Sequence, residues 1–322
     1  MTVVNVVKHI IEHCGALQTD EQVLVLYDNS TRAVASVFLQ YLGGINANYN
    51  SFELTRTDTH GVEPPAKVAE EMKRSDLILC LTYYSLAHTQ ARMDATNGKS
   101  RFLSMPEYSL PLLEDPALMT DYTSRLPVVE AMTQALTIGK ELYIETEMGT
   151  RLTLDIQGRN GNCCPGFVNQ RLRLGSPPDI ESNIAPNETC TEGKLVIDGS
   201  ITHPLIGKLN DPVELIISKG KITSFHCKNK EVSKTLELIF ANVKSDKAYY
   251  LAEVGVGLNK DAVLCGNMLV DEGSYGSLHF GFGSNYTIQG NNKVSFHLDF
   301  VMTKANMYID QIMVIKEGEV LI

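Results

Sequence analysis

The sequence predicts an α/β N-terminal domain with a parallel sheet at residues 1–135 and a β-rich α+β C-terminal domain at residues 136–322. Before residue 135, short apolar runs alternate with helical patterns, which is typical of a parallel sheet covered on both faces. From about Gly139, short β-rich segments are separated by Gly, Asn and Asp turns, and only 231–243 has a clear helical pattern. With 322 residues, each domain can bury its own core.

The first domain begins with an amphipathic segment at 1–17 that charged and histidine residues interrupt, so it is expected to be a helix and not a secretory signal. An apolar strand at 23–27 runs into Asp-Asn-Ser-Thr, whose side chains suit a helix N-cap, and a helix at 34–42 follows. The remaining elements are expected to be a helix at 66–74, a strand at 77–83 and a helix at 89–96.

This order of elements is Rossmann-like, and loops at the carboxyl ends of parallel strands tend to hold ligands. His88 stands just past the strand at 77–83 and is therefore a candidate substrate contact. The alternative is a solvated loop histidine.

The second domain is expected to be mainly β-sheet. Its predicted strands include 141–147, 151–156, 194–198, 213–217 and 250–258.

Composition excludes several classes of protein. The net charge of −10 argues against nucleic acid as a partner, because affinity for phosphates comes from Lys and Arg. No apolar stretch approaches the roughly 20 residues that span a bilayer, and we expect a cytoplasmic protein without membrane contact. Seven cysteines, an odd and scattered number, predict no disulfide framework. The adjacent Cys163 and Cys164 could be soft metal ligands, or structural thiols in a loop.

The most informative segment is 294–300, Val-Ser-Phe-His-Leu-Asp-Phe. Side chains alternate between the two faces of a strand, so His297 and Asp299 share one face while Phe296 and Phe300 share the other. An imidazole and a carboxylate side by side can bind one metal ion. The alternative is an edge strand whose polar face meets water.

Two further strands repeat this pattern with glycine. In 277–283, His279 shares its face with Gly281 and Gly283, and in 251–258, Glu253 stands with Gly255 and Gly257. Glycine weakens a strand, so these positions suggest that a ligand or another part of the chain approaches that face. A β-bulge or barrel corner is the alternative. Imidazoles with carboxylates suit zinc, manganese, cobalt or ferrous iron.

The motifs of the second half, in their order, resemble the thermophilic leucyl aminopeptidase family, that is, aminopeptidase T and its relatives. The motifs are Glu181-Ser-Asn-Ile-Ala-Pro186, Ala252-Glu253-Val254, Asp271-Glu272 followed by His279-Phe-Gly-Phe-Gly283 and Tyr286, and His297-Leu-Asp299. The interval from Asp271 to His279 is slightly longer than in the peptidases, and the chain is shorter. A divergent branch that contains 2,5-dihydroxypyridine 5,6-dioxygenase is equally similar in length and in Ser85-Leu-Ala-His-Thr89.

The resemblance implies two chemistries. In a metallo-aminopeptidase, Glu181, Glu253, His279, His297 and Asp299 would hold two metal ions, with Zn, Co or Mn expected. Glu181 could also act in catalysis, and Tyr286 would stabilise the oxyanion unless it is only a packed loop aromatic. In a dioxygenase, one Fe(II) would be held by His297, Asp299 and either His279 or Glu253.

Retention of both Glu181 and Glu253 favours the hydrolase, and a non-catalytic metal-binding relative is a third possibility. The expected substrate is a short peptide or another small molecule. Analogy with the peptidase family predicts a homodimer.

Overall fold

The computed structural model describes residues 2–322, and the chain divides into two compact units. The first unit extends to Tyr122 and also includes Gly166–Pro178, whereas the second contains Thr123–Pro165 and Asp179–Ile322. The division therefore falls after Tyr122 and not near residue 135, and a later segment returns to the first unit. Among the described residues, no helix is long and apolar enough to cross a membrane.

A five-stranded parallel sheet forms the centre of the first unit, as expected, with the strand order β2-β1-β3-β4-β8. Its strands are β1 (Gln22–Asp28), β2 (Asn48–Leu54), β3 (Leu77–Cys80), β4 (Arg101–Ser104) and β8 (Leu174–Gly175). Its helices are α1 (Val3–Lys8), α2 (Arg32–Gly44), α3 (Ala66–Arg74) and α4 (Gln90–Asn97), with a π-helical turn His9–Cys14 and 3₁₀ turns Leu112–Glu114 and Pro116–Met119. Buried side chains of β1 and β3 pack against α3 and α4.

Several elements of the first unit differ from their predicted form. Helix α3 has the predicted bounds, but β3 ends at Cys80, before the predicted end at Tyr83. The edge strand β2 was not predicted because none of its side chains is fully buried, so it lacks an apolar run. Strand β8 has only two residues and gives no pattern in the sequence.

Two antiparallel sheets form the second unit. One has the order β14-β13-β10-β6-β5-β18-β19-β20 and the other β12-β11-β17-β16-β15-β9-β7. The first contains β5 (Glu141–Glu145), β6 (Arg151–Asp155), β10 (Glu192–Ile197), β13 (Val213–Ser218), β14 (Lys221–Cys227), β18 (Asn306–Ile309), β19 (Ile312–Lys316) and β20 (Glu319–Val320). The second contains β7 (Asn162–Cys164), β9 (Glu181–Ile184), β11 (Ser200–Ile201), β12 (Gly207–Lys208), β15 (Leu251–Gly257), β16 (Leu278–Gly283) and β17 (His297–Met302).

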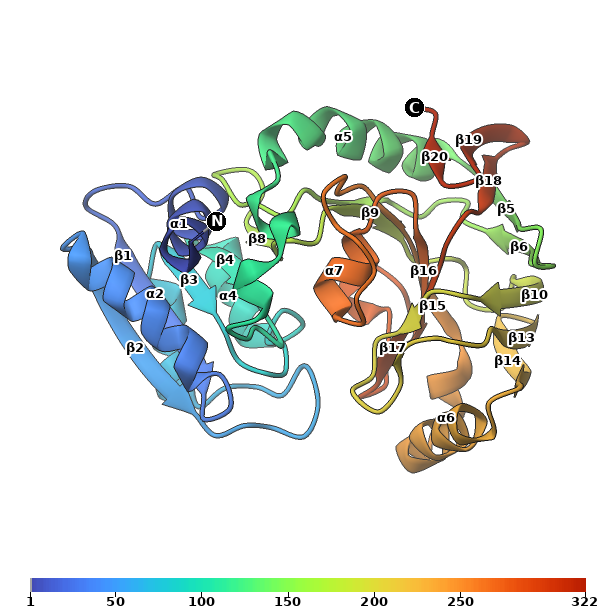
Figure 1. The fold of residues 1–322 in the computed structure, drawn as a ribbon, viewed down its shortest axis with the longest axis horizontal. Helices are drawn as coiled ribbons and strands as arrows, with labels where there is room; N and C mark the ends of the chain where they lie inside the picture. The colour runs from blue at the N-terminus through green and yellow to red at the C-terminus, as the bar shows by residue number, and fades with distance from the viewer. Residues whose placement is uncertain (1) are drawn as a thin grey trace. The chain divides into compact units, whose positions relative to one another are not determined.

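The helices of the second unit are α5 (Tyr122–Ile138), α6 (Lys230–Val243) and α7 (Met268–Gly273), with 3₁₀ turns Asp246–Tyr249 and Tyr286–Ile288. Figure 1 shows α6, in orange, beside the β13–β14 hairpin. Helix α6 has nearly the predicted bounds, whereas α5 was missed. Its sequence contains Pro127 and its apolar residues do not gather on one face, so the helical period is weak.

A cluster of aromatic side chains supports the seven-stranded sheet. The Phe240 ring of α6 lies 5.2 Å from that of Phe296 and 6.5 Å from that of Phe300, and Phe300 meets Phe282 edge-on at 5.3 Å. The side chains of Phe240, Phe282 and Phe300 are almost completely buried. One face of β16 and β17 is therefore closely packed and rigid, and it fixes where the opposite face directs its polar side chains.

Candidate metal centre

Four neighbouring strands of the seven-stranded sheet bring the five predicted ligand residues together. Glu181 comes from β9, Glu253 from β15, His279 from β16, and His297 and Asp299 from β17. These strands are adjacent in the order β17-β16-β15-β9, so residues separated by up to 118 positions in the sequence meet on one face.

The five side chains form two groups that share Glu253. The potential ligand atoms of Glu181, Glu253 and His279 lie within 4.8 Å of one another, and so do those of Glu253, His297 and Asp299. His279 Nε2 is 2.9 Å from Glu181 Oε2 and 3.9 Å from Glu253 Oε1. His297 Nε2 is 3.1 Å from Asp299 Oδ1 and 3.4 Å from Glu253 Oε2.

Glycine makes the room that this arrangement needs. Gly255 pairs with His279 across the sheet, and Gly281 pairs with Asp299. A Cβ atom on Gly255 would lie 2.0 Å from the His279 ring, and one on Gly281 would lie 2.6 Å from the His297 ring. The glycines therefore let each imidazole lie across the neighbouring strand.

The polar atoms of the cluster fit a cation. Glu181 Oε2 and His279 Nδ1 are buried without a hydrogen-bond partner among the described residues. Although Glu181 Oε2 approaches His279 Nε2 closely, the two atoms do not meet in hydrogen-bond geometry. Buried polar atoms are normally paired, so unpaired ones on one polar face indicate a missing partner. A divalent metal ion bound by imidazole and carboxylate would be such a partner.

Electrostatics lead to the same conclusion. Burial alone would lower the pKa of both histidines, but the neighbouring carboxylates have a larger effect. Glu181 raises the pKa of His279 well above the usual range, and Asp299 does the same for His297. Burial would raise the pKa of Glu253, but its contacts with both histidines lower it well below the usual range. The buried carboxylates thus require nearby positive charge, which a divalent cation would also supply.

Two carboxyl groups beside the cluster were not predicted as metal ligands, although Glu272 belongs to one of the motifs that carry the family resemblance. Burial raises the pKa of Asp179 and of Glu272 well above the usual range. The negative charge of Glu181 raises the pKa of Asp179 further, and that of Asp299 raises the pKa of Glu272 further. Each has one buried oxygen without a hydrogen-bond partner among the described residues. Asp179 stands only two residues before Glu181 but outside strand β9, so the alternation of a strand does not identify it.

The remaining candidates do not belong to the two groups of potential metal ligands. His88 is exposed between β3 and α4 in the first unit. Tyr286 is 55% exposed, and Lys293 Nζ lies 4.8 Å from the centre of its ring. Cys164 pairs across the sheet with Glu181, and burial raises the pKa of its thiol. Roles for His88 in substrate binding and Tyr286 in catalysis stay predictions.

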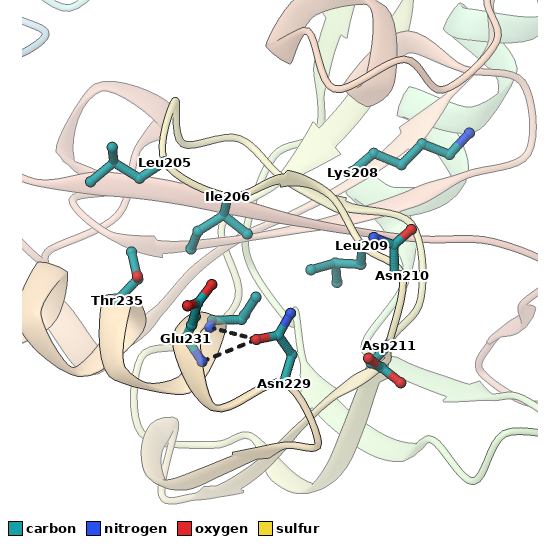
Figure 2. A pocket seen from close by; sticks show the side chains of 10 residues that line it. Leu205, Ile206, Lys208, Leu209, Asn210, Asp211, Asn229, Glu231 and Thr235 are labelled. Atoms are coloured by element: carbon teal, nitrogen blue, oxygen red, sulfur yellow. Dashed lines mark hydrogen bonds between the residues drawn. The ribbon is translucent and has the colours of Figure 1, made fainter.

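A hollow of about 260 Å³ lies in the second unit between the loop around residues 205–211 and the N-terminus of α6 (Figure 2). The Asn229 side chain at its rim accepts hydrogen bonds from Glu231 N and Val232 N and so caps the helix. None of the five clustered residues lines this hollow.

Comparisons with known proteins extend over the whole described chain. A family model described as 2,5-dihydroxypyridine 5,6-dioxygenase matches residues 2–322. A curated protein of that name from Pseudomonas putida (strain KT2440) is 28% identical over 145 residues, which is 42% of this chain and only 41% of the relative.

Solved structures share the fold. The 2,5-dihydroxypyridine dioxygenase from Pseudomonas putida KT2440 has a TM-score of 0.85 at 18% identity, covering 99% of this chain and 96% of that one. AmpT from Thermus thermophilus has a TM-score of 0.71 at 13% identity, covering 99% of both chains. The match to the family model decides between the two: the chain belongs to the 2,5-dihydroxypyridine 5,6-dioxygenase family.

Proposed function

We propose that this protein is an Fe(II)-dependent dioxygenase that cleaves a dihydroxylated aromatic ring of the dihydroxypyridine class. The observation that carries the proposal is the family match over residues 2–322. The sequence alone favoured a metallo-aminopeptidase because Glu181 and Glu253 are both present. The comparisons support the alternative better, since the likeness to AmpT is one of fold only.

The proposed iron ligands are His297 and Asp299, with the third ligand supplied by His279 or Glu253. We favour His279, because two imidazoles and one carboxylate are the set that non-haem Fe(II) oxygenases use. When bound, the iron supplies open positions at which dioxygen and the ring hydroxyls can meet.

The chain's own residues hold this set in place. The Asp299 backbone N–H donates to Thr202 Oγ1 at 3.3 Å, and the Thr202 N–H donates to the Asp299 carbonyl at 3.0 Å. The His297 Nδ1–H donates to the Ser284 carbonyl at 2.9 Å, which directs the Nε2 lone pair towards Asp299 and Glu253. The buried phenylalanines on the opposite face of the sheet keep water from that side of the strands.

One observation favours a second candidate, a dinuclear aminopeptidase-like hydrolase. The two groups of three residues share Glu253, so that each could hold one ion. In this alternative Glu181 is a metal ligand, whereas in the dioxygenase it is not.

Metal analysis of the wild type and of Glu181→Gln, both purified anaerobically without chelator, separates the candidates. The dioxygenase predicts about one iron per chain in both proteins, with dioxygen uptake on 2,5-dihydroxypyridine. The hydrolase predicts a fall from about two ions to about one in the variant, with cleavage of leucine p-nitroanilide by the wild type.

The control is Glu237→Gln, which makes the same change at an exposed position of α6. Two zinc, cobalt or manganese ions per wild-type chain, with no uptake of dioxygen, would refute the proposed dioxygenase. Metal content with turnover of neither substrate would indicate the non-catalytic relative.

A further inference from the structure

His297 differs from His279 in how its ring is held. A carbonyl oxygen can only accept a hydrogen bond, so the contact with the Ser284 carbonyl places the proton of neutral His297 on Nδ1 and leaves Nε2 free to bind a cation. By contrast, Nδ1 of His279 is buried without a hydrogen-bond partner among the described residues. The orientation of His297 therefore depends on the loop that carries Ser284, between β16 and β17.

Asn285, the next residue, organises that loop. It is fully buried, its Oδ1 accepts from Asn292 N at 2.8 Å, and its backbone N–H donates to the Asn292 carbonyl at 3.0 Å. Asn292 in turn donates from Nδ2 to the carbonyl of Gly283 at 2.6 Å. The two asparagines thus brace the backbone on both sides of Ser284.

The loop is also clamped from outside. Asn285 Nδ2 donates to Glu188 Oε1 at 3.2 Å, and Arg159 Nη2 lies 2.6 Å from Glu188 Oε2. Arg159 Nη1 donates to the Gln289 carbonyl at 2.8 Å. The Arg159–Glu188 pair is largely buried, so its hydrogen bonds are charge-assisted and resist exchange with water.

The Asn285 side chain packs directly against Gly290 on the other arm of the loop. A Cβ atom on Gly290 would lie 1.9 Å from Asn285 Cγ, so the amide fills the space between the two arms of the loop. A side chain that is held this closely transmits the position of the clamp to the backbone.

We propose that Asn285, held by Glu188 and Arg159, is a positioning residue that orients His297 for metal binding through the Ser284 carbonyl. The inference rests on the metal site proposed above. It assigns the loop between β16 and β17 a role in the strength and geometry of metal binding, in addition to its structural role.

The test is the affinity of the metal-free protein for Co(II), measured by competition with a chelator together with the Co(II) absorption spectrum. Loss of partners that orient a metal ligand costs about 10–100-fold in affinity. We expect Asn285→Ala to weaken Co(II) binding at least about tenfold and to change the spectrum.

Asn291→Ala is the matched control, because it makes the same change at an exposed position of the same loop and keeps the backbone N–H that binds Glu188. Glu188→Gln is a milder second variant that retains the shape of the clamp if Asn285→Ala does not fold. It should weaken Co(II) binding severalfold and change the Co(II) spectrum in the same way. Wild-type Co(II) affinity and spectrum in a folded Asn285→Ala or Glu188→Gln protein would overturn the positioning role. Absence of Co(II) binding by the wild type would instead overturn the metal site itself.

Discussion

Replacing Gly255 by alanine tests the cluster without removing any proposed ligand. The added Cβ atom would lie 2.0 Å from Cε1 and Nε2 of His279 and 2.9 Å from Glu181 Oε2. An ordinary contact needs at least 3.4 Å, so the His279 ring must move by about 1.4 Å. Metal–ligand distances tolerate only about 0.2 Å. The ring therefore cannot accept the methyl group and remain a ligand.

We expect Gly255→Ala to lower the affinity for a divalent metal by about 100-fold or more. Losing a residue that only orients a ligand costs about 10–100-fold in metal affinity, and losing the ligand itself should cost at least as much. The fold should survive, since overpacking of a core typically costs 1–3 kcal/mol. Competition with a chelator gives the affinity, and circular dichroism with thermal unfolding of the metal-free protein reports the fold.

Gly44→Ala is the control, since no heavy atom lies within 4 Å of a Cβ atom built there. A folded Gly255→Ala protein with wild-type metal affinity would refute the reasoning, because the His279 ring would then not be part of the site.

Three further predictions concern stability and reactivity. Phe240→Ala should destabilise the protein by about 3–5 kcal/mol in denaturant unfolding, whereas Leu238→Ala, at a 54% exposed position of the same helix, should cost far less. Burial, and then the charge of His13, lower the pKa of His9 in the folded protein, so as the pH falls the unfolded chain binds a proton at His9 before the folded chain does. The free energy of unfolding should therefore decrease as the pH drops below about 6.5, and this decrease should be smaller in His9→Gln. Burial raises the pKa of the Cys14 thiol, so this cysteine should not react with iodoacetamide at pH 8 until the protein is denatured, whereas the exposed Cys190 should be labelled. Mass spectrometry of peptides from the native and the denatured protein measures both reactions.

The polar face of the site could be predicted from local patterns. Alternation along 294–300 places His297 and Asp299 together, and the glycines beside His279 and Glu253 indicate an open face. In the structure this space is filled by imidazoles of neighbouring strands. Sequence periodicity identifies the face of a strand but not the identity of its neighbours, so the shared position of Glu253 between two groups required the strand order.

Other features had no local signal. Glu181 reaches the cluster only because β9 pairs with β15, which brings Glu181 opposite Gly257. The loop residue Asn285 has no periodic pattern, and its role depends on Glu188, which is 97 positions away. The choice of chemistry was also beyond the sequence patterns, because the same residue types suit one iron or two other ions.

The return of Gly166–Pro178 to the first unit affects the order in which the protein can fold during synthesis. Strand β8 supplies the outer edge of the parallel sheet, Arg173 O accepts from Phe102 N, and Tyr108 Oη–H donates to the Pro177 carbonyl. A ribosome-bound chain that has released only the first 122 residues still lacks these partners, so the N-terminal sheet has an open edge until residue 178 has emerged. By then the ribosome has also released α5, β5, β6 and β7 of the second unit, so these elements wait without most of their partners while the parallel sheet of the first unit is completed.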